Sequence, residues 1–191
     1  MRIGVLAVQG AFAEHIAAVK KLGAAAFEIR QPRDIDGHFD GLILPGGEST
    51  VMKKLLHELG LFEPLKKRIE SGLPVLGTCA GMILLAGSID GGEAPCFGTM
   101  DITVKRNAYG RQLGSFVCEE KFAGKDITMR FIRAPYVSEA GERVEVLAVH
   151  DGKIVAVRQG NQLAAAFHPE LTDDGTVYEM FFKMIAKSLA A

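Results

Sequence analysis

The 191-residue sequence predicts an α/β fold, a three-layer α/β/α sandwich with a mainly parallel central sheet and an antiparallel β insertion in its second half. Short apolar runs alternate with amphipathic helical segments through residue 86, which indicates parallel strands joined by right-handed crossovers. From about residue 97 onward, short strands and turns follow one another instead. The length suits one domain spanning residues 1–191, with a core that needs no disulfides.

Strands and helices are expected to alternate in the first half. Residues 2–8 form an apolar run closed by Gln9 and Gly10, which is typical of a strand covered on both faces. A helix with apolar residues at helical spacing follows and ends at Gly23. Ser49 is expected to cap a later helix. Further strands are predicted over 25–30, 41–44 and 74–77, and further helices over 49–59, 63–71 and 80–86.

Short strands dominate the second half. Asp151 and Gly152 form a strong hairpin turn between two of them. The last segment places Val177, Phe181 and Ile185 on one helical face. The strands are predicted over 98–105, 113–119, 129–133, 144–150, 153–159 and 162–167.

Composition excludes several functional classes. A net charge of −1 without a basic stripe argues against nucleic acid as a partner. Three cysteines, at 79, 96 and 118, are too few and odd in number for a disulfide framework, and they suit a reducing compartment. No apolar run is long enough to cross a membrane. We therefore expect a cytoplasmic protein.

Cys79 is the candidate nucleophile. It lies in the sequence G-T-C-A-G at 77–81, between a predicted strand and a predicted helix. A small-x-nucleophile-x-small turn of this kind is a nucleophile elbow, in which glycines allow close backbone approach. The helix start would favour the thiolate and offer N–H groups to an oxyanion. Cys96 and Cys118 lack such a context and are interpreted as structural.

His168 is the candidate base. It ends the apolar strand 162–167, and the edge where strands end is where α/β active sites gather. Glu170, two residues later, is placed to orient the imidazole. The other histidines are interpreted as surface or half-buried residues: His15, His38, His57 and His150.

Further candidates flank this predicted site. Gly46 and Gly47 follow the third strand, where their unshielded N–H groups can face an oxyanion. Arg106 and Arg133 stand at strand ends in the insertion. A guanidinium can hold the α-carboxylate of an amino-acid substrate with two hydrogen bonds.

With these motifs the sequence resembles the class I (triad) glutamine amidotransferases, which have a flavodoxin-like fold. The resemblance runs from Met1 to the C-terminal helix, and it is most specific to the glutaminase subunits of pyridoxal 5′-phosphate synthase. Its R-N-x-x-G-R-Q and I-R-A-P sequences mark this subfamily. The shared segments are residues 7–11, 42–50, 77–82, 106–112, 131–136 and 167–171.

The resemblance implies a function and a set of residues. Cys79, His168 and Glu170 would form the triad that hydrolyses L-glutamine to L-glutamate and ammonia. The ammonia would pass to a PdxS-like (β/α)8-barrel subunit for pyridoxal 5′-phosphate (vitamin B6) biosynthesis, without metal or organic cofactor. The substrate-binding residues would be Gly46, Gly47, Glu48, Ser49, Arg106, Ile132 and Arg133. Gln9 and Gly10 would lie at the partner interface and help order the oxyanion site.

Two other functions remain open from the residues alone. A cysteine hydrolase of the same fold would share the elbow but cleave peptides or small amides without a coupled synthase. A binding subunit with a relict site would not react at Cys79 with a γ-glutamyl analogue.

Overall fold

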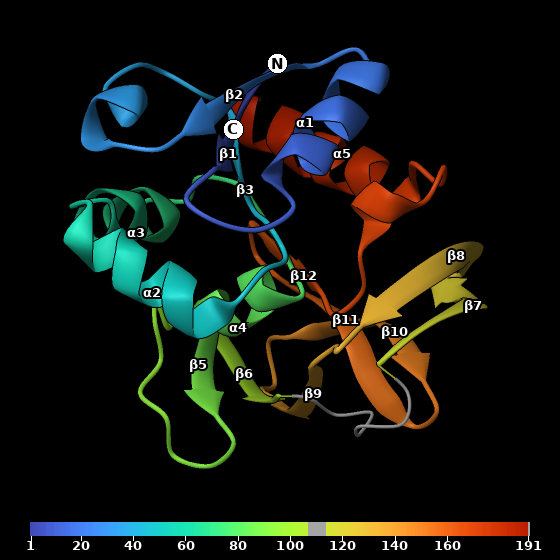
Figure 1. The fold of residues 1–191 in the computed structure, drawn as a ribbon. Helices are drawn as coiled ribbons and strands as arrows, with labels where there is room; N and C mark the ends of the chain where they lie inside the picture. Colours follow the sequence, from blue (N-terminus) through green and yellow to red (C-terminus); the bar gives the residue numbers. More distant parts are fainter. Residues whose placement is uncertain (107–113, 191) are drawn as a thin grey trace.

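The computed structural model describes residues 1–106 and 114–190, and its fold is the predicted three-layer α/β sandwich (Figure 1). A ten-stranded sheet forms the centre in the order β2-β1-β3-β4-β12-β11-β9-β6-β5, with β10 paired to β11. Helices α1 and α5 lie on one side of the parallel strands, and α2, α3 and α4 on the other (Figure 1). The fold class predicted from the sequence is therefore confirmed.

The parallel part of the sheet contains β2, β1, β3, β4 and β12. All residues of β3 and β4 are buried, because helices cover both faces of these strands. The elements are β1 (Arg2–Leu6), α1 (Phe12–Lys21), β2 (Ala25–Ile29), η1 (Pro32–Ile35), β3 (Gly41–Leu44), α2 (Ser49–Glu58), α3 (Phe62–Glu70), β4 (Val75–Thr78), α4 (Ala80–Leu85), β12 (Gln162–Ala165), η2 (Pro169–Leu171) and α5 (Thr176–Leu189).

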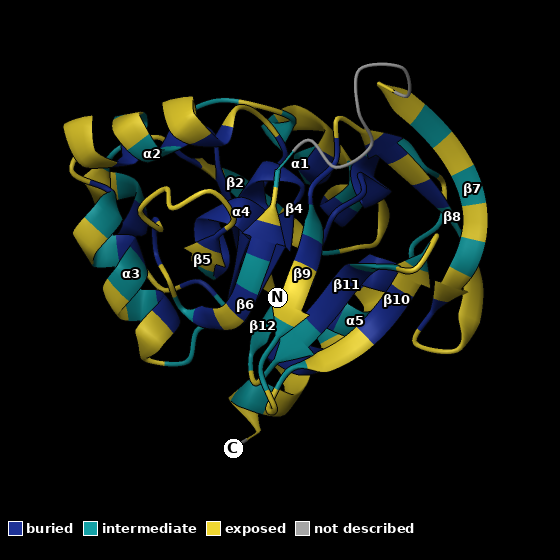
Figure 2. Ribbon diagram, turned by 90° about the horizontal axis from the view of Figure 1, so that it is seen from below, coloured by how far each residue is buried: buried dark blue, intermediate teal, exposed yellow. Residues whose placement is uncertain are grey.

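Most of the predicted insertion extends the same sheet rather than forming a separate unit. Strands β11, β9 and β6 continue it in antiparallel order beyond β12. Only β7 and β8 form a separate two-stranded sheet, whose residues alternate between exposed and more buried positions (Figure 2). The elements are β5 (Ala86–Ile89), β6 (Met100–Lys105), β7 (Ser115–Phe122), β8 (Lys125–Ile132), β9 (Tyr136–Ala140), β10 (Glu145–His150) and β11 (Lys153–Gln159).

Several local features differ from the sequence prediction. The strands predicted over 2–8 and 162–167 end two residues earlier, at Leu6 and Ala165, and the strand predicted over 129–133 spans Lys125–Ile132. Strands β5 and β9 were not predicted: β5 follows α4 without a turn residue, and β9 carries polar Ser138 and Glu139. Ser49 is the first residue of α2 rather than its cap, because Glu48 occupies the N-cap position without a side-chain bond. The candidate residues still lie in the turns that follow β3, β4 and β12.

Within residues 1–106 and 114–190, no helix combines the length and the apolar content needed to cross a bilayer.

Candidate active site

Cys79 occupies a sharp turn between β4 and α4. Its φ of 48° and ψ of −101° are costly for a residue with a Cβ, on the order of 1–3 kcal/mol. The backbone N–H of Cys79 donates to the Ala165 carbonyl at 2.8 Å, which ties the turn to β12. A Cβ on Gly81 would overlap the Leu44 carbonyl oxygen, and one on Gly77 would lie 2.7 Å from the backbone of Gly81. The glycines are therefore required by close packing, as expected of a nucleophile elbow.

His168 and Glu170 lie in the turn that follows β12, which ends at Ala165. The two side chains are buried, and Nδ1 of His168 lies 2.6 Å from Oε1 of Glu170. Pro169 begins the short helix η2, which places Glu170 beside the imidazole. The backbone N–H of His168 donates to the Arg130 carbonyl of β8 at 2.8 Å. The imidazole is thus held both from its own turn and from the neighbouring hairpin.

The backbone of Gly46 packs against both Cys79 and His168. A Cβ on Gly46 would overlap Cε1 of His168 and would lie 3.4 Å from Cβ of Cys79. On its other side the Cys79 sulfur lies 3.9 Å from the Ile132 carbonyl oxygen. The structure therefore brings the ends of β3, β4, β8 and β12 together around one sulfur atom.

The electrostatics of His168 are set by its neighbours. Burial lowers the pKa of His168, but hydrogen bonding and charge attraction from the Cys79 sulfur, as a thiolate, and from the Glu170 carboxylate raise it, to about 10 overall. The pKa of Glu170 is lowered despite burial, chiefly by His15 and His168. At neutral pH the imidazole is therefore protonated and the carboxylate ionised. Within the described residues, Nε2 of His168 makes no hydrogen bond, and catalytic hydrogen bonds are often long before substrate binds.

The other two cysteines are chemically different. Burial raises the pKa of the Cys96 thiol to about 11. The pKa of Cys118 is also raised, by burial and by the charges of Glu120 and Glu119. Both thiols are therefore poor nucleophiles near neutral pH, because the thiolate is the reactive form.

The Gln9–Gly10 loop lies against the Gly46–Glu48 turn. Oε1 of Gln9 accepts the backbone N–H of Glu48 at 2.8 Å, and the Ala11 N–H donates to the Gly46 carbonyl at 2.9 Å. Gly10 has a φ of 95°, and a Cβ there would overlap the Gly46 carbonyl oxygen. The two segments therefore fix each other's backbone.

Arg106 reaches the start of α2 from the end of β6. Its guanidinium pairs with Glu93 at 2.6 Å and with Glu48 at 3.3 Å, and it donates to Oγ1 of Thr50 at 3.2 Å. Ser49 is buried beside this contact. The rest of the R-N-x-x-G-R-Q motif, residues 107–112, lies outside the described residues.

Ile132 and Arg133 stand at the end of β8. Both are exposed, and Arg133 has a φ of 44° and donates its backbone N–H to the Gly114 carbonyl at 2.7 Å. The Ile132 carbonyl is the group that faces the Cys79 sulfur. These residues border the same site from the hairpin side.

His15 corrects the sequence interpretation. We expected a surface or half-buried residue, but its side chain is fully buried and contacts the site. Its Nε2 lies 3.0 Å from Oγ1 of Thr78 and 3.4 Å from Oε2 of Glu170, and its Nδ1 lies 2.8 Å from the Tyr178 hydroxyl. The signal was its spacing: His15 lies four residues before buried Val19, on the inner face of α1. His38 and His57 are exposed, and His150 is half-buried.

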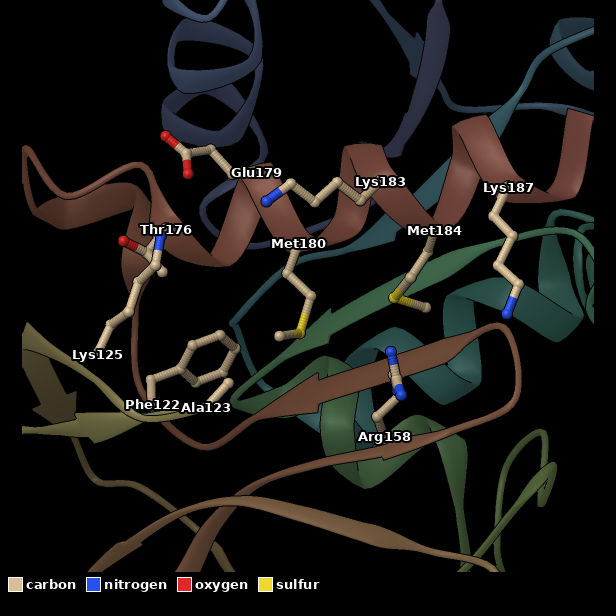
Figure 3. A pocket seen from close by; sticks show the side chains of 10 residues that line it. All are labelled: Phe122, Ala123, Lys125, Arg158, Thr176, Glu179, Met180, Lys183, Met184 and Lys187. Carbon is tan, nitrogen blue, oxygen red and sulfur yellow. The ribbon is translucent and has the colours of Figure 1, made fainter. Parts of the chain in front are cut away.

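A cavity of about 260 Å³ lies away from this site, between α5 and the turn that joins β7 to β8 (Figure 3). Met180 extends from α5 toward Phe122, and Met184 extends toward Arg158 (Figure 3). No candidate catalytic residue lines this cavity. Its polar rim consists of Lys125, Arg158, Thr176, Glu179, Lys183 and Lys187.

Known proteins are similar to this chain in sequence and in fold. The pattern of the SNO glutamine amidotransferase family matches residues 5–187. "Pyridoxal 5'-phosphate synthase subunit PdxT" of Methanocorpusculum labreanum is 59% identical over 97% of this chain and 98% of its own length. The protein of the same name from Haemophilus influenzae is 52% identical over 95% and 96%.

Solved structures agree with these relatives. A crystal structure described as glutamine amidotransferase covers 96% of this chain and 98% of its own, with a TM-score of 0.91 and 44% identity. A glutamine amidotransferase from Thermotoga maritima has a TM-score of 0.64 at 13% identity, over 100% of this chain and 84% of its own, and so shows the fold alone. The resemblance inferred from the motifs is confirmed: the chain belongs to the SNO glutamine amidotransferase family.

Proposed function

We propose that the chain is the glutaminase subunit of a pyridoxal 5′-phosphate synthase, which hydrolyses L-glutamine to L-glutamate and ammonia for a partner subunit. The observation that carries the proposal is the 2.6 Å contact between His168 and Glu170, at the sheet edge that also presents Cys79. Relatives named as this subunit align over nearly the whole chain, which supports the same assignment.

In the first half-reaction the Cys79 thiolate attacks the side-chain carbonyl carbon of glutamine. A carbon–sulfur bond forms, and the carbonyl oxygen becomes an oxyanion. His168 holds the proton that the departing amide nitrogen needs, as its raised pKa allows. The carbon–nitrogen bond then breaks, and ammonia leaves behind a γ-glutamyl thioester on Cys79.

In the second half-reaction water cleaves the thioester. His168, now neutral, takes a proton from the water as the oxygen attacks the thioester carbon. The carbon–sulfur bond breaks, and glutamate leaves with the thiolate restored. Glu170 keeps the Nδ1 proton of His168 fixed, so that Nε2 faces the reacting atoms in both steps.

The flanking residues have roles in binding. We assign Gly46 and Gly47, with the start of α4, to the oxyanion, because Gly46 lies against both catalytic side chains. We assign Glu48, Ser49 and Arg106, with Ile132 and Arg133, to the glutamine itself. The contacts of Arg106 with Glu48 and Thr50 support one binding surface that joins the start of α2 to the end of β6.

The partner is expected to be the (β/α)8-barrel synthase subunit, which receives the ammonia. Gln9 and Gly10 are assigned to that interface. They are accessible at the surface and also fix the backbone of the Gly46–Glu48 turn. A partner that touches this loop can therefore act on the oxyanion site.

Glutamate release with and without the barrel subunit tests the proposal. We expect glutamate release and a complex of higher mass when both chains are present, and no cleavage of peptides by either preparation. Peptide cleavage, or a mixture that neither associates nor releases glutamate, would contradict it.

A further inference from the structure

A buried polar cluster contacts Glu170. It joins three elements distant in sequence: His15 from α1, Thr78 from β4 and Tyr178 from α5. All three side chains are buried, at 0–1% exposure. Polar groups at this depth are costly unless they are paired, so the cluster is a defined arrangement rather than incidental packing.

The carboxylate determines where the proton of His15 lies. Burial lowers the pKa of His15, which keeps its imidazole neutral, with one N–H. Ionised Glu170 only accepts hydrogen bonds, and its Oε2 lies 3.4 Å from Nε2 of His15. The proton therefore belongs on Nε2, which also lies 3.0 Å from Oγ1 of Thr78.

Tyr178 completes this assignment from the other side. Burial raises the pKa of Tyr178, so its hydroxyl keeps a proton to donate. That hydroxyl lies 2.8 Å from Nδ1 of His15, the ring nitrogen that remains an acceptor. The Tyr178 hydroxyl thus fixes the tautomer of His15 in the way that Glu170 fixes that of His168.

The second oxygen of Glu170 needs this donor. Oε1 is held by His168, but Oε2 is buried and completes no hydrogen bond within the described residues. The Nε2–H of His15 is hydrogen-bonded to Oγ1 of Thr78 and also lies beside this oxygen, with 3.4 Å between Nε2 and Oε2, so it stabilises the carboxylate by a polar contact. Without the contact from His15, this buried and charged oxygen would be left unsatisfied, which is costly. The carboxylate would then turn toward another donor and lose its alignment with His168.

We propose that His15 is a positioning residue for the reaction, whose Nε2–H holds Glu170 in the orientation that aligns His168 with Cys79, with its tautomer set by Tyr178. The inference deepens the proposed glutaminase function and rests on it. His15 acts through Glu170 and touches neither glutamine nor the sulfur.

Two substitutions of His15 distinguish a role as hydrogen donor to Glu170 from a role in filling buried space. The side-chain amide of glutamine reaches the place of the histidine Nε2, whereas that of asparagine reaches only the place of Nδ1. His15→Gln therefore keeps a donor for Glu170, and His15→Asn keeps a partner only for Tyr178. His57→Asn, on the exposed face of α2, is the matched control.

The readout is alkylation of Cys79 by iodoacetamide at pH 7 in the full chain alone, followed by mass spectrometry of the Cys79 peptide. We expect His15→Asn to slow labelling about tenfold, the factor for one hydrogen bond to a charged group. His15→Gln and His57→Asn should stay close to the wild-type rate. In the complex with the barrel subunit, His15→Asn should lower kcat for glutamine and leave KM unchanged.

Equal labelling rates for the two His15 variants, whether both fast or both slow, would overturn the inference. Tyr178→Phe, which removes one oxygen, serves if His15→Asn does not fold: it should slow labelling, and a wild-type rate would also overturn the inference. Labelling needs neither glutamine nor the barrel subunit. A wild-type chain that labels normally but releases no glutamate would therefore defeat the proposed function and leave this comparison intact.

Discussion

The parallel and antiparallel parts of the molecule bring different kinds of group to the same edge. Gly46, Cys79 and His168 follow strands β3, β4 and β12, in buried backbone where an added Cβ on Gly46 would overlap His168. Arg106 and Arg133 directly follow strands β6 and β8; Arg106 is half-buried and Arg133 is exposed. We infer that the parallel part supplies the reacting groups, and that the antiparallel part adds the two arginines to the substrate contacts of Glu48 and Ser49.

Loss of the nucleophile gives the largest expected effect. Cys79→Ala should lower glutamine turnover in the complex by about 10⁴-fold or more, because no other group can form the thioester. Glutamine binding should persist, since the residues assigned to recognition do not include Cys79. Turnover is measured as glutamate release, and binding by calorimetry with Cys118→Ala as control. Retained turnover in Cys79→Ala would show that the parallel part does not supply the nucleophile.

Gly46 tests whether backbone packing fixes the chemistry. Gly46→Ala would push its Cβ into His168, and a displacement of about 1 Å can lower a rate about 10²-fold. We expect kcat to fall by that order in the glutaminase assay while the chain still folds. Gly37→Ala, where the nearest atom to an added Cβ is 3.4 Å away on a flexible Arg2 side chain, is the control. An unchanged kcat would mean that the imidazole is not held by this contact.

Arg106 tests the antiparallel part. Arg106→Ala should raise KM for glutamine about tenfold, through loss of a charge-assisted bond to the α-carboxylate, and should change kcat little. Its neighbour Lys105, an exposed residue paired with Asp90, provides a matched control as Lys105→Ala. Saturation kinetics of the two variants separate the outcomes. A fall in kcat without a change in KM would place Arg106 with the chemistry instead.

Much of this edge was predictable because its motifs are local. The elbow at 77–81 and the turn at 168–170 specify their own geometry over a few residues, and parallel strands direct both to one edge. The glycine at 46 was identified for the same reason, since it directly follows a buried strand.

The features that the sequence did not predict depend on contacts between distant segments, which no single segment encodes. His15 fits an ordinary amphipathic helix, and its role emerges only where α1 meets Glu170, Thr78 and Tyr178. Strand β9 pairs with β6 and β11, so its polar sequence is stabilised by neighbours rather than by its own propensity. The contact of Arg106 with Glu93 likewise joins two loops that have no shared pattern.

The smallest expected effect is on stability, and it tests whether the parallel site acts as one electrostatic unit. His168 is faced by Cys79 and Glu170, with neutral His15 behind the carboxylate, and its pKa is about 10 in the folded chain against about 6.5 when unfolded. A group whose pKa is raised by folding adds stability that is complete below pH 6.5 and disappears as the pH rises through 10.

The wild type should therefore exceed His168→Asn in thermal midpoint by a margin that shrinks between pH 6.5 and pH 10. His57→Asn should follow the wild type throughout, because its side chain lies exposed on α2. Differential scanning calorimetry of the three proteins across this range provides the measurement. A constant margin would mean that packing, and not the charge shared with Cys79 and Glu170, is what His168 contributes to the parallel part.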